Sequence, residues 1–136
     1  MAGFLTDYTN NKVLDLFFGS SSFIAPATLY FGLSSSPSSK GGGGISEPTG
    51  GGYARAILGN SSTNFPAATA GMKTNSAVIV FPAPTADWGA MQSLFVSDAA
   101  MGGNIIAMAD LTVSKLIKSG SAPPTVAIGA LFLSHT

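Results

Sequence analysis

Apolar residues recur in short alternating runs, and each run is bounded by glycine, proline, serine or asparagine. The run ATLYFGLSSS (27–36) places Leu29, Phe31 and Leu33 on one face of an extended chain. A period of two is typical of β-strands with a buried face. Further runs predict strands at YARAIL (53–58), AVIVF (77–81), MQSLFVSD (91–98), NIIAMADLTVSKLI (104–117) and TVAIGALFLSH (125–135). Short strands separated by turn signals indicate a mainly β fold, a β-sandwich or jelly roll.

Two of these runs carry further expectations. The run at 104–117 fits either one long strand or two strands that bend near Asp110. The last run is apolar on both faces, so we expect a strand that is buried on both sides. Between two predicted strands, DAAMGGN (98–104) contains Gly102 and Gly103, which permit the positive φ that a hairpin loop requires.

One short helix is predicted near the N-terminus, over about 6–18. Thr6 or Asp7 is suited to begin it, and Gly19 is suited to end it. Its apolar residues form pairs four positions apart: Val13 with Phe17, and Leu14 with Phe18. Residues at this spacing share a helix face, so we expect this apolar end to dock on another surface.

The stretch SSSPSSKGGGGISEPTGGG (34–52) lacks apolar periodicity. Its composition cannot pack a core, so we expect a long exposed loop that becomes ordered on docking. Its last glycines, 50–52, run into the predicted strand at 53–58. A phosphate-binding loop would instead need G-x-x-x-x-G-K-[ST] before a helix, and a dinucleotide site G-x-G-x-x-G opening a helix. We interpret the glycines as a flexible entry to a strand.

Charged side chains are scarce in this chain. Six basic and six acidic residues make up 9% of the 136 residues and balance to zero net charge, against about 25% charged residues in an ordinary globular domain. A free protein usually carries a mixed-charge surface, whereas interface cores are depleted in charge. The composition therefore favours an assembly subunit over the alternative of a Ser/Thr-rich secreted β-protein, with 1–136 forming a single domain. It argues against a nucleic-acid partner, which would require a basic surface.

No membrane partner is expected. Polar and charged residues at 7–12 interrupt the region where a signal peptide would be apolar. No run reaches the roughly 18 apolar residues of a membrane span. Cysteine is absent, so no disulfide framework exists.

Few residues are available for catalysis. The one histidine, His135, lies beside the C-terminus, the serines at 20–22 lack a G-x-S-x-G elbow, and no zinc ligand set can be assembled. A glycosidase would need two carboxylates about 5–9.5 Å apart. The acidic residues, which form no recognisable pair, are Asp7, Asp15, Glu47, Asp87, Asp98 and Asp110. We expect no enzyme activity, cofactor, metal or small-molecule substrate.

Arg55 and Trp88 are the polar and aromatic residues of most interest. On a strand at 53–58, Arg55 would share one side with Tyr53 and Ile57. We expect it to form a structural ion pair or to contact another subunit. Its candidate carboxylate partners are Glu47, Asp87 and Asp98. Trp88, the only tryptophan, fits a core position and an interface anchor equally well.

The order of these segments resembles a group of small bacteriophage structural proteins, labelled either tail fibre or capsid decoration (cement) proteins. The likeness runs through PATLYFGL, GGGYAR, FPAPTADWG, VSDAAMGGNII and ALFL. Its most specific positions are Gly51, Gly52, Tyr53, Ala54, Arg55, Asp87, Trp88, Gly89, Asp98, Gly102 and Gly103. The resemblance implies a compact β-domain built into a virion, without catalytic activity. SSKGGGG and SGSAPPTVA depart from the pattern and leave the loop contacts open.

Our main hypothesis is a decoration protein on the capsid exterior that stabilises the shell by bridging major capsid subunits. The alternative is a tail fibre or another tail-associated, receptor-binding component of the same virion. The expected partners are the major capsid protein and copies of the chain itself, with a dimer favoured over a trimer. The candidate interface residues are Val13, Leu14, Phe17, Phe18, Lys40, Ile45, Tyr53, Arg55 and Trp88.

Overall fold

The computed structural model describes residues 1–135, whose strands form one large sheet and one small sheet. The elements are β1 (Ala2–Leu5), α1 (Asp7–Phe17), β2 (Thr28–Ser34), β3 (Ala56–Gly59), β4 (Met72–Thr74), β5 (Ile79–Val80), β6 (Gly89–Ser97), β7 (Ile105–Ile117), β8 (Thr125–Val126) and β9 (Phe132–Ser134). The large sheet has the order β3-β2-β6-β7-β1-β9-β4, and β5 pairs with β8. Strands β1 and β9 are parallel, and the other pairs are antiparallel.

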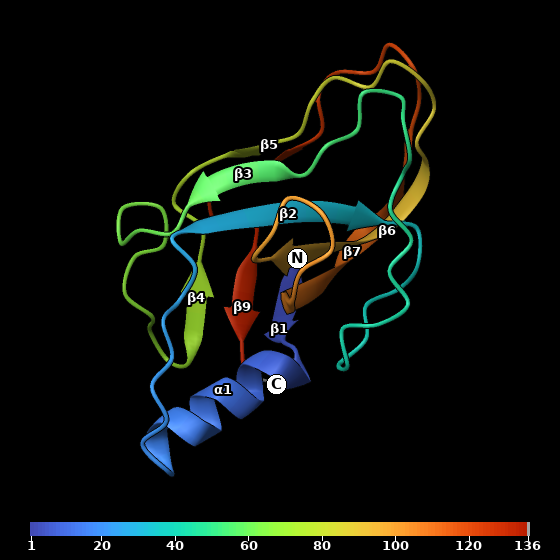
Figure 1. The fold of residues 1–136 in the computed structure, drawn as a ribbon. Coiled ribbons are helices and arrows are strands. Elements are labelled where there is room, and N and C mark those ends of the chain that lie inside the picture. The colour runs from blue at the N-terminus through green and yellow to red at the C-terminus, as the bar shows by residue number, and fades with distance from the viewer. Residues whose placement is uncertain (136) are drawn as a thin grey trace.

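The large sheet curls around its apolar side. Figure 1 shows β2 and β3 running across the direction of β1, β9 and β4. On the inner face, Phe31 pairs with Val96 and Leu33 pairs with Leu94, and all four are buried. The Phe65 ring stacks on Phe31 with 6.4 Å between ring centroids. The prediction of a mainly β, sandwich-like fold with one short helix is confirmed, whereas this strand order does not confirm a jelly roll.

The outer face of β2 and β6 is covered as well. Gly32 pairs with Phe95 on this face, and the Phe95 ring is fully buried. The Arg55 guanidinium lies over the ring, 4.9 Å from its centroid. A Cβ atom at position 32 would overlap the ring, so only glycine fits there. An irregular layer, rather than a second full sheet, therefore closes this side.

Most predicted strands occur, some in shorter form. The run at 27–36 contains β2, and the run at 91–98 overlaps β6, which begins two residues earlier. The run at 77–81 shortens to β5, and 98–104 is the expected loop between β6 and β7. The run at 104–117 was compatible with one strand or two, and the structure shows one strand, β7. Its register with β6 shifts after Asp110, because Ser93 faces Asp110 while Met91 faces Lys115. The bend therefore appears as a bulge within β7.

The prediction of one doubly buried strand at 125–135 is wrong. The run divides into β8 and β9, and Ile128 in the intervening turn is 62% exposed. Buried Asn75 holds this turn: its side-chain amide donates to the Ala127 carbonyl (2.9 Å), and its Oδ1 accepts from the Leu131 N–H (3.1 Å). Gly129 adopts φ +75°, which a continuous strand does not contain.

The strand predicted at 53–58 begins three residues later, as β3. The expectation that Arg55 and Ile57 share one side is wrong, because Arg55 is 9% exposed and Ile57 is 67% exposed. Side-chain hydrogen bonds, described below, hold Tyr53 and Arg55 in place of strand pairing.

The predicted helix is confirmed as α1, but its attachment differs from the expectation. Thr6 occupies the N-cap position, yet its hydroxyl donates to carbonyls of β7 instead of capping the helix. The Thr9 hydroxyl donates to the Ile106 carbonyl over 2.7 Å. No residue of α1 is buried, so the apolar end of the helix does not dock within the described chain, and its docking on another surface stays a prediction. Polar side chains fasten the start of the helix, and its apolar end extends past the sheet.

Replacing Gly32 with alanine tests the covered outer face. We expect Gly32→Ala to lower the free energy of unfolding by about 1–3 kcal/mol, because the new methyl group must displace the buried Phe95 ring. Urea unfolding monitored by circular dichroism measures the change. Gly43→Ala is the control, since a Cβ there meets open space, and equal stability of the two variants would contradict this account.

Candidate interaction site

Arg55 forms the centre of a buried polar cluster. Its Nε and Nη2 atoms bind the two oxygens of the Glu47 carboxylate at 3.0 and 2.8 Å. Its Nη1 donates to the carbonyls of Ala99 (2.7 Å) and Gly102 (2.9 Å) in the β6–β7 loop. Of the three expected carboxylate partners, the structure selects Glu47. One side chain thus joins the 34–52 loop to the 98–104 loop.

Tyr53 extends the cluster to β2. Its hydroxyl donates to Glu47 Oε1 over 2.6 Å and accepts from the Leu33 N–H over 3.1 Å. Burial raises the pKa of Tyr53, and the neighbouring Glu47 carboxylate raises it further. Burial also pushes the pKa of Glu47 upward, but the hydrogen bonds from Arg55 and Tyr53 and the Arg55 charge outweigh it and leave this pKa below 4.5. The hydrogen bond to Glu47 raises the pKa of Arg55, so the pair stays ionised.

Trp88 lies in the core beside this cluster. Its ring meets Tyr53 edge-on at 5.2 Å, and its indole N–H donates to the Gly51 carbonyl over 2.8 Å. Of the two roles weighed for Trp88, the structure shows the core position, while an interface role stays a prediction. Gly51 has φ +61°, and a Cβ there would lie 3.2 Å from the Trp88 Nε1 atom, which explains why glycine occupies position 51.

The other acidic groups near these loops also bind the chain itself. The Asp98 carboxylate accepts from the backbone and side-chain N–H groups of Asn104 (2.8 and 2.9 Å). Asp87 accepts from the Ser119 N–H over 2.8 Å. Within residues 1–135, no three His, Cys, Asp or Glu side chains group as metal ligands. In the same range, no helix has the length and apolar character to span a bilayer.

The Ser/Gly loop at 34–52 contacts the body at several points. The Ser34 hydroxyl accepts from the N–H groups of Ser36 and Ser46 at 3.1 and 2.9 Å. The Ser38 N–H donates to the Asp110 carboxylate over 2.8 Å. These bonds hold Ser36 and Ser46 of the loop against β2, and Ser38 against β7.

Lys40 and Ile45 are the two loop residues predicted to lie in an interface. The Lys40 ammonium donates to the carbonyls of Leu5 and His135, both at 3.1 Å, and the Lys40 carbonyl accepts from the Asp7 N–H at the start of α1. Ile45 is half-buried. Lys40 therefore binds its own chain, although its side chain remains exposed.

Six of the fourteen exposed large apolar residues in the described chain lie at, or just after, the free end of α1. We define the α1 tip surface as the large apolar residues exposed within 14–24: Leu14, Leu16, Phe17, Phe18, Phe23 and Ile24. Phe18 is 80% exposed and Ile24 is 91% exposed. Figure 1 shows α1 extending below the sheet, with the chain returning from its free end to β2. Of the candidate interface residues, Leu14, Phe17 and Phe18 lie in this surface, and Val13 beside them is half-buried.

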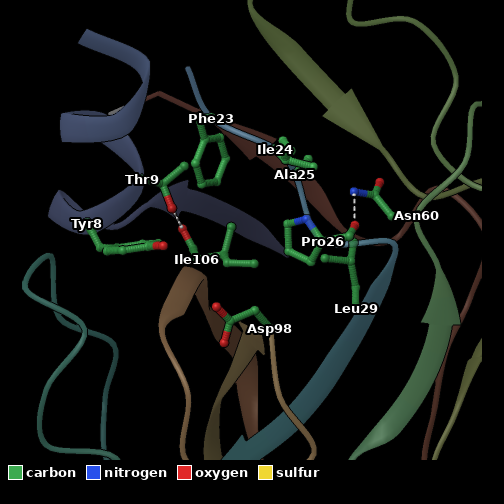
Figure 2. A pocket seen from close by; sticks show the side chains of 10 residues that line it. All are labelled: Tyr8, Thr9, Phe23, Ile24, Ala25, Pro26, Leu29, Asn60, Asp98 and Ile106. Atoms are coloured by element: carbon green, nitrogen blue, oxygen red, sulfur yellow. Dashed lines mark hydrogen bonds between the residues drawn. The ribbon is translucent and has the colours of Figure 1, made fainter. Parts of the chain in front are cut away.

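A pocket of about 470 Å³ lies between α1 and the returning segment. Figure 2 shows Tyr8 and Thr9 on the α1 side, Phe23 directed toward the centre, and Ile106 at the base. Its lining residues are Tyr8, Thr9, Phe23, Ile24, Ala25, Pro26, Leu29, Asn60, Asp98 and Ile106. Phe23 and Ile24 belong to both the pocket and the α1 tip surface, so the two features are continuous.

Sequence reasoning found the helix end but missed the pocket. The only local sequence feature that points to the pocket is the pair Phe23–Ile24. These are two large apolar residues between SSS and Pro26, in a stretch without periodicity. The other walls come from α1, β2, β7 and two loops. Nothing local in the sequence places these segments together.

The fold and its surface define a small, mainly β structural domain that uses its polar groups to hold its own loops. Residues 4–134 match the family model described as Podophage GP4 fiber I protein gp80, and the chain belongs to this family. No curated protein matches it. The chain is therefore a bacteriophage virion structural protein of the fibre type.

The family assignment confirms the resemblance to phage virion proteins. It agrees better with the tail-fibre alternative than with capsid decoration, and it gives no specific support to the capsid exterior. A structural fibre family also agrees with the expectation of a non-enzymatic role.

Removing the Arg55 guanidinium tests the polar cluster. We expect Arg55→Met to lower the free energy of unfolding by about 2–4 kcal/mol, because two loop carbonyls lose the Arg55 donor and Glu47 loses its charged partner. Thermal and urea unfolding measure the loss. The control, Lys118→Met, removes an exposed charge and should change stability by less than about 0.5 kcal/mol. Equal effects would contradict a structural role for the cluster.

The lowered pKa of Glu47 predicts a dependence of stability on pH. The folded state favours the ionised carboxylate, so this contribution is present above pH 4.5 and is lost as pH falls through the folded pKa. We expect Glu47→Gln to show a smaller loss of stability than the unmodified protein between pH 5 and about pH 3. Urea unfolding at each pH measures this. The exposed Asp15→Asn variant should retain the full slope, and a Glu47→Gln slope equal to it would refute the assignment.

Proposed function

We propose that the chain is a component of the phage tail fibre or its attachment apparatus, joined to the particle through the α1 tip surface. The observation that carries this proposal is the apolar end of α1. A surface helix of a self-contained globular domain normally packs its apolar face against the core. Here the polar start of α1 contacts β7 and the apolar end contacts solvent.

The size of the α1 tip surface supports an assembly role. At about 200 Å² for each fully exposed residue, its six residues together expose roughly 750 Å². The largest apolar patch on a typical monomer covers about 300–600 Å². The scarcity of charge agrees with this, because repulsion between like charges does not oppose close packing.

The tail is preferred to the capsid shell because the family description names a fibre protein. The role is mechanical: the β-domain supplies a stable body, and the α1 tip surface supplies the contact. Neither Arg55 nor Trp88 is free to make that contact in the isolated chain, because their polar atoms bind residues of the same chain.

Locating the chain in the virion tests the proposal. We expect antibody labelling in electron micrographs to mark the tail, and quantitative mass spectrometry to find few copies compared with the major shell protein. Uniform labelling of the shell, with a copy number that matches the shell lattice, would instead support capsid decoration.

A variant phage tests the role of the surface. We expect the double variant Phe17→Ser and Phe18→Ser to fold but to be depleted from purified particles, because the contact loses its aromatic residues. Val113→Ser is the matched control, since Val113 is 77% exposed on β7, away from α1. Normal incorporation of the double variant would exclude this surface as the attachment site.

A further inference from the structure

We infer that the chain binds a small apolar carboxylic acid in its ionised form, with the apolar body in a cavity inside the curled sheet and the carboxylate paired with Lys73. This site goes beyond the proposed function, because it lies within the β-domain and not on the α1 tip surface. It depends on three features of the described chain: an apolar cavity, a lysine beside it without a counter-charge, and walls without acidic groups.

The cavity has a volume of about 130 Å³ and lies on the inner face of the large sheet. Strands β1, β2, β6, β7 and β9 supply most of its wall, and Phe65 comes from the segment after β3. We call it the Lys73 cavity; its walls include Phe31, Phe65, Val96 and Leu133, and its only polar members are Asn60 and Lys73.

An apolar group of about six carbon atoms fits this volume. An engineered cavity of about 150 Å³ lined by leucine, isoleucine and phenylalanine binds benzene. The Lys73 cavity is slightly smaller, and its walls have the same chemistry. A bound apolar group would add dispersion contacts to Phe31, Phe65 and Val96, which are all buried. The cavity therefore suits a short chain or a single ring.

Lys73 places a positive charge beside the cavity. It lies on β4 opposite Leu133 of β9, so the two side chains share one face of the sheet. Lys73 is half-buried, whereas the other lysines of the chain are exposed. Within residues 1–135 the only ion pair joins Arg55 to Glu47, so Lys73 has no counter-charge there. A half-buried charge without a partner favours an anionic ligand.

An outer pocket of about 400 Å³ adjoins the cavity, and Asn60, Phe65 and Lys73 line both. Lysine usually lays its alkyl stem along apolar walls and keeps its ammonium group toward water. This arrangement places the Lys73 ammonium group where the cavity and the outer pocket meet. The hydroxyl groups of Ser61 and Ser62 line the outer pocket as further donors for a carboxylate. Among the described residues, no acidic side chain lines either space.

The groove beside the Arg55 cluster, of about 550 Å³, is a weaker candidate for an anion site. The Arg55 guanidinium is already bonded to the Glu47 carboxylate and to two loop carbonyls. An anionic ligand would have to compete with Glu47, which lines the same groove. Lys73 requires no such exchange.

Titration of the purified full chain with hexanoate, followed by NMR, tests the cavity. We expect saturable binding with a dissociation constant on the order of 1 mM, as suits so small a ligand. Butanoate should bind roughly tenfold more weakly, because less apolar surface enters the cavity. Equal binding of the two acids, or no saturable binding of hexanoate at about ten times this concentration, would overturn the inference.

Removing the charge tests the role of Lys73. We expect Lys73→Met to weaken hexanoate binding roughly tenfold and to leave the binding of uncharged 1-hexanol unchanged. The matched control is Lys118→Met, which removes an exposed charge and should bind hexanoate as the unmodified protein does. Circular dichroism confirms that each variant is folded. Equal affinity of both variants for hexanoate would overturn the ion pair, as would equal affinity of the unmodified protein for hexanoate and 1-hexanol.

The chemical shifts locate the ligand. We expect the methyl resonances of Leu29, Val96 and Leu133 to move during the hexanoate titration, and those of Leu14 and Val113 to stay in place. Shifts confined to Leu14 and its neighbours in the α1 tip surface would overturn the proposed location. These measurements use the isolated chain, so their failure leaves the tail assignment standing, and labelling of the capsid shell would leave the Lys73 site standing.

Discussion

The fold depends on buried polar side chains that bind the backbone of its loops. The buried polar and charged residues are Thr6, Ser34, Arg55, Asn75, Ser93 and Ser97. Each of them forms a hydrogen bond to a backbone group outside its own strand or turn. Long segments of this chain lie outside helices and strands, and their backbone groups must still be satisfied where they are buried. A few short polar side chains and one arginine meet this requirement, so the loops become part of the rigid body.

Because neutral polar side chains hold most of the loops, the fold needs few charged side chains. The ion pair between Arg55 and Glu47 is partly buried and joins two loops, so its bonds position the irregular layer over Phe95. Such a pair contributes more through the geometry that it fixes than through net stability, because desolvation offsets much of the attraction. The rest of the surface carries little charge, and six exposed large apolar residues lie at the end of α1, where they do not pack into the core.

Local patterns in the sequence predicted the local structure. The incorrect predictions arose where contacts with residues distant in the sequence determine the conformation. The alternation in 27–36 and 91–98 predicted β2 and β6, and the spacing of Val13 and Phe17 predicted α1. The run at 125–135 also alternates, yet Asn75 bonds its middle into a turn, and no feature of the run itself signals that. Arg55 was recognised as an ion-pair residue with Glu47 among three candidates, but only the fold could select the partner. The pocket joins α1 to segments near residues 60, 98 and 106, so the sequence alone could not reveal it.

The attachment of α1 links its stability to assembly. The helix has 11 residues, and isolated helices shorter than about 12–15 residues are marginal in water. Only its start is bonded to the sheet, through Thr6 and Thr9, so its free end lacks the packing that normally stabilises an amphipathic helix. A partner that covered Phe17 and Phe18 would supply that packing and would stabilise the helical form in proportion to its own binding. The proposed attachment through this surface would therefore remove the cost of exposing the apolar end, and it would couple the stability of α1 to assembly.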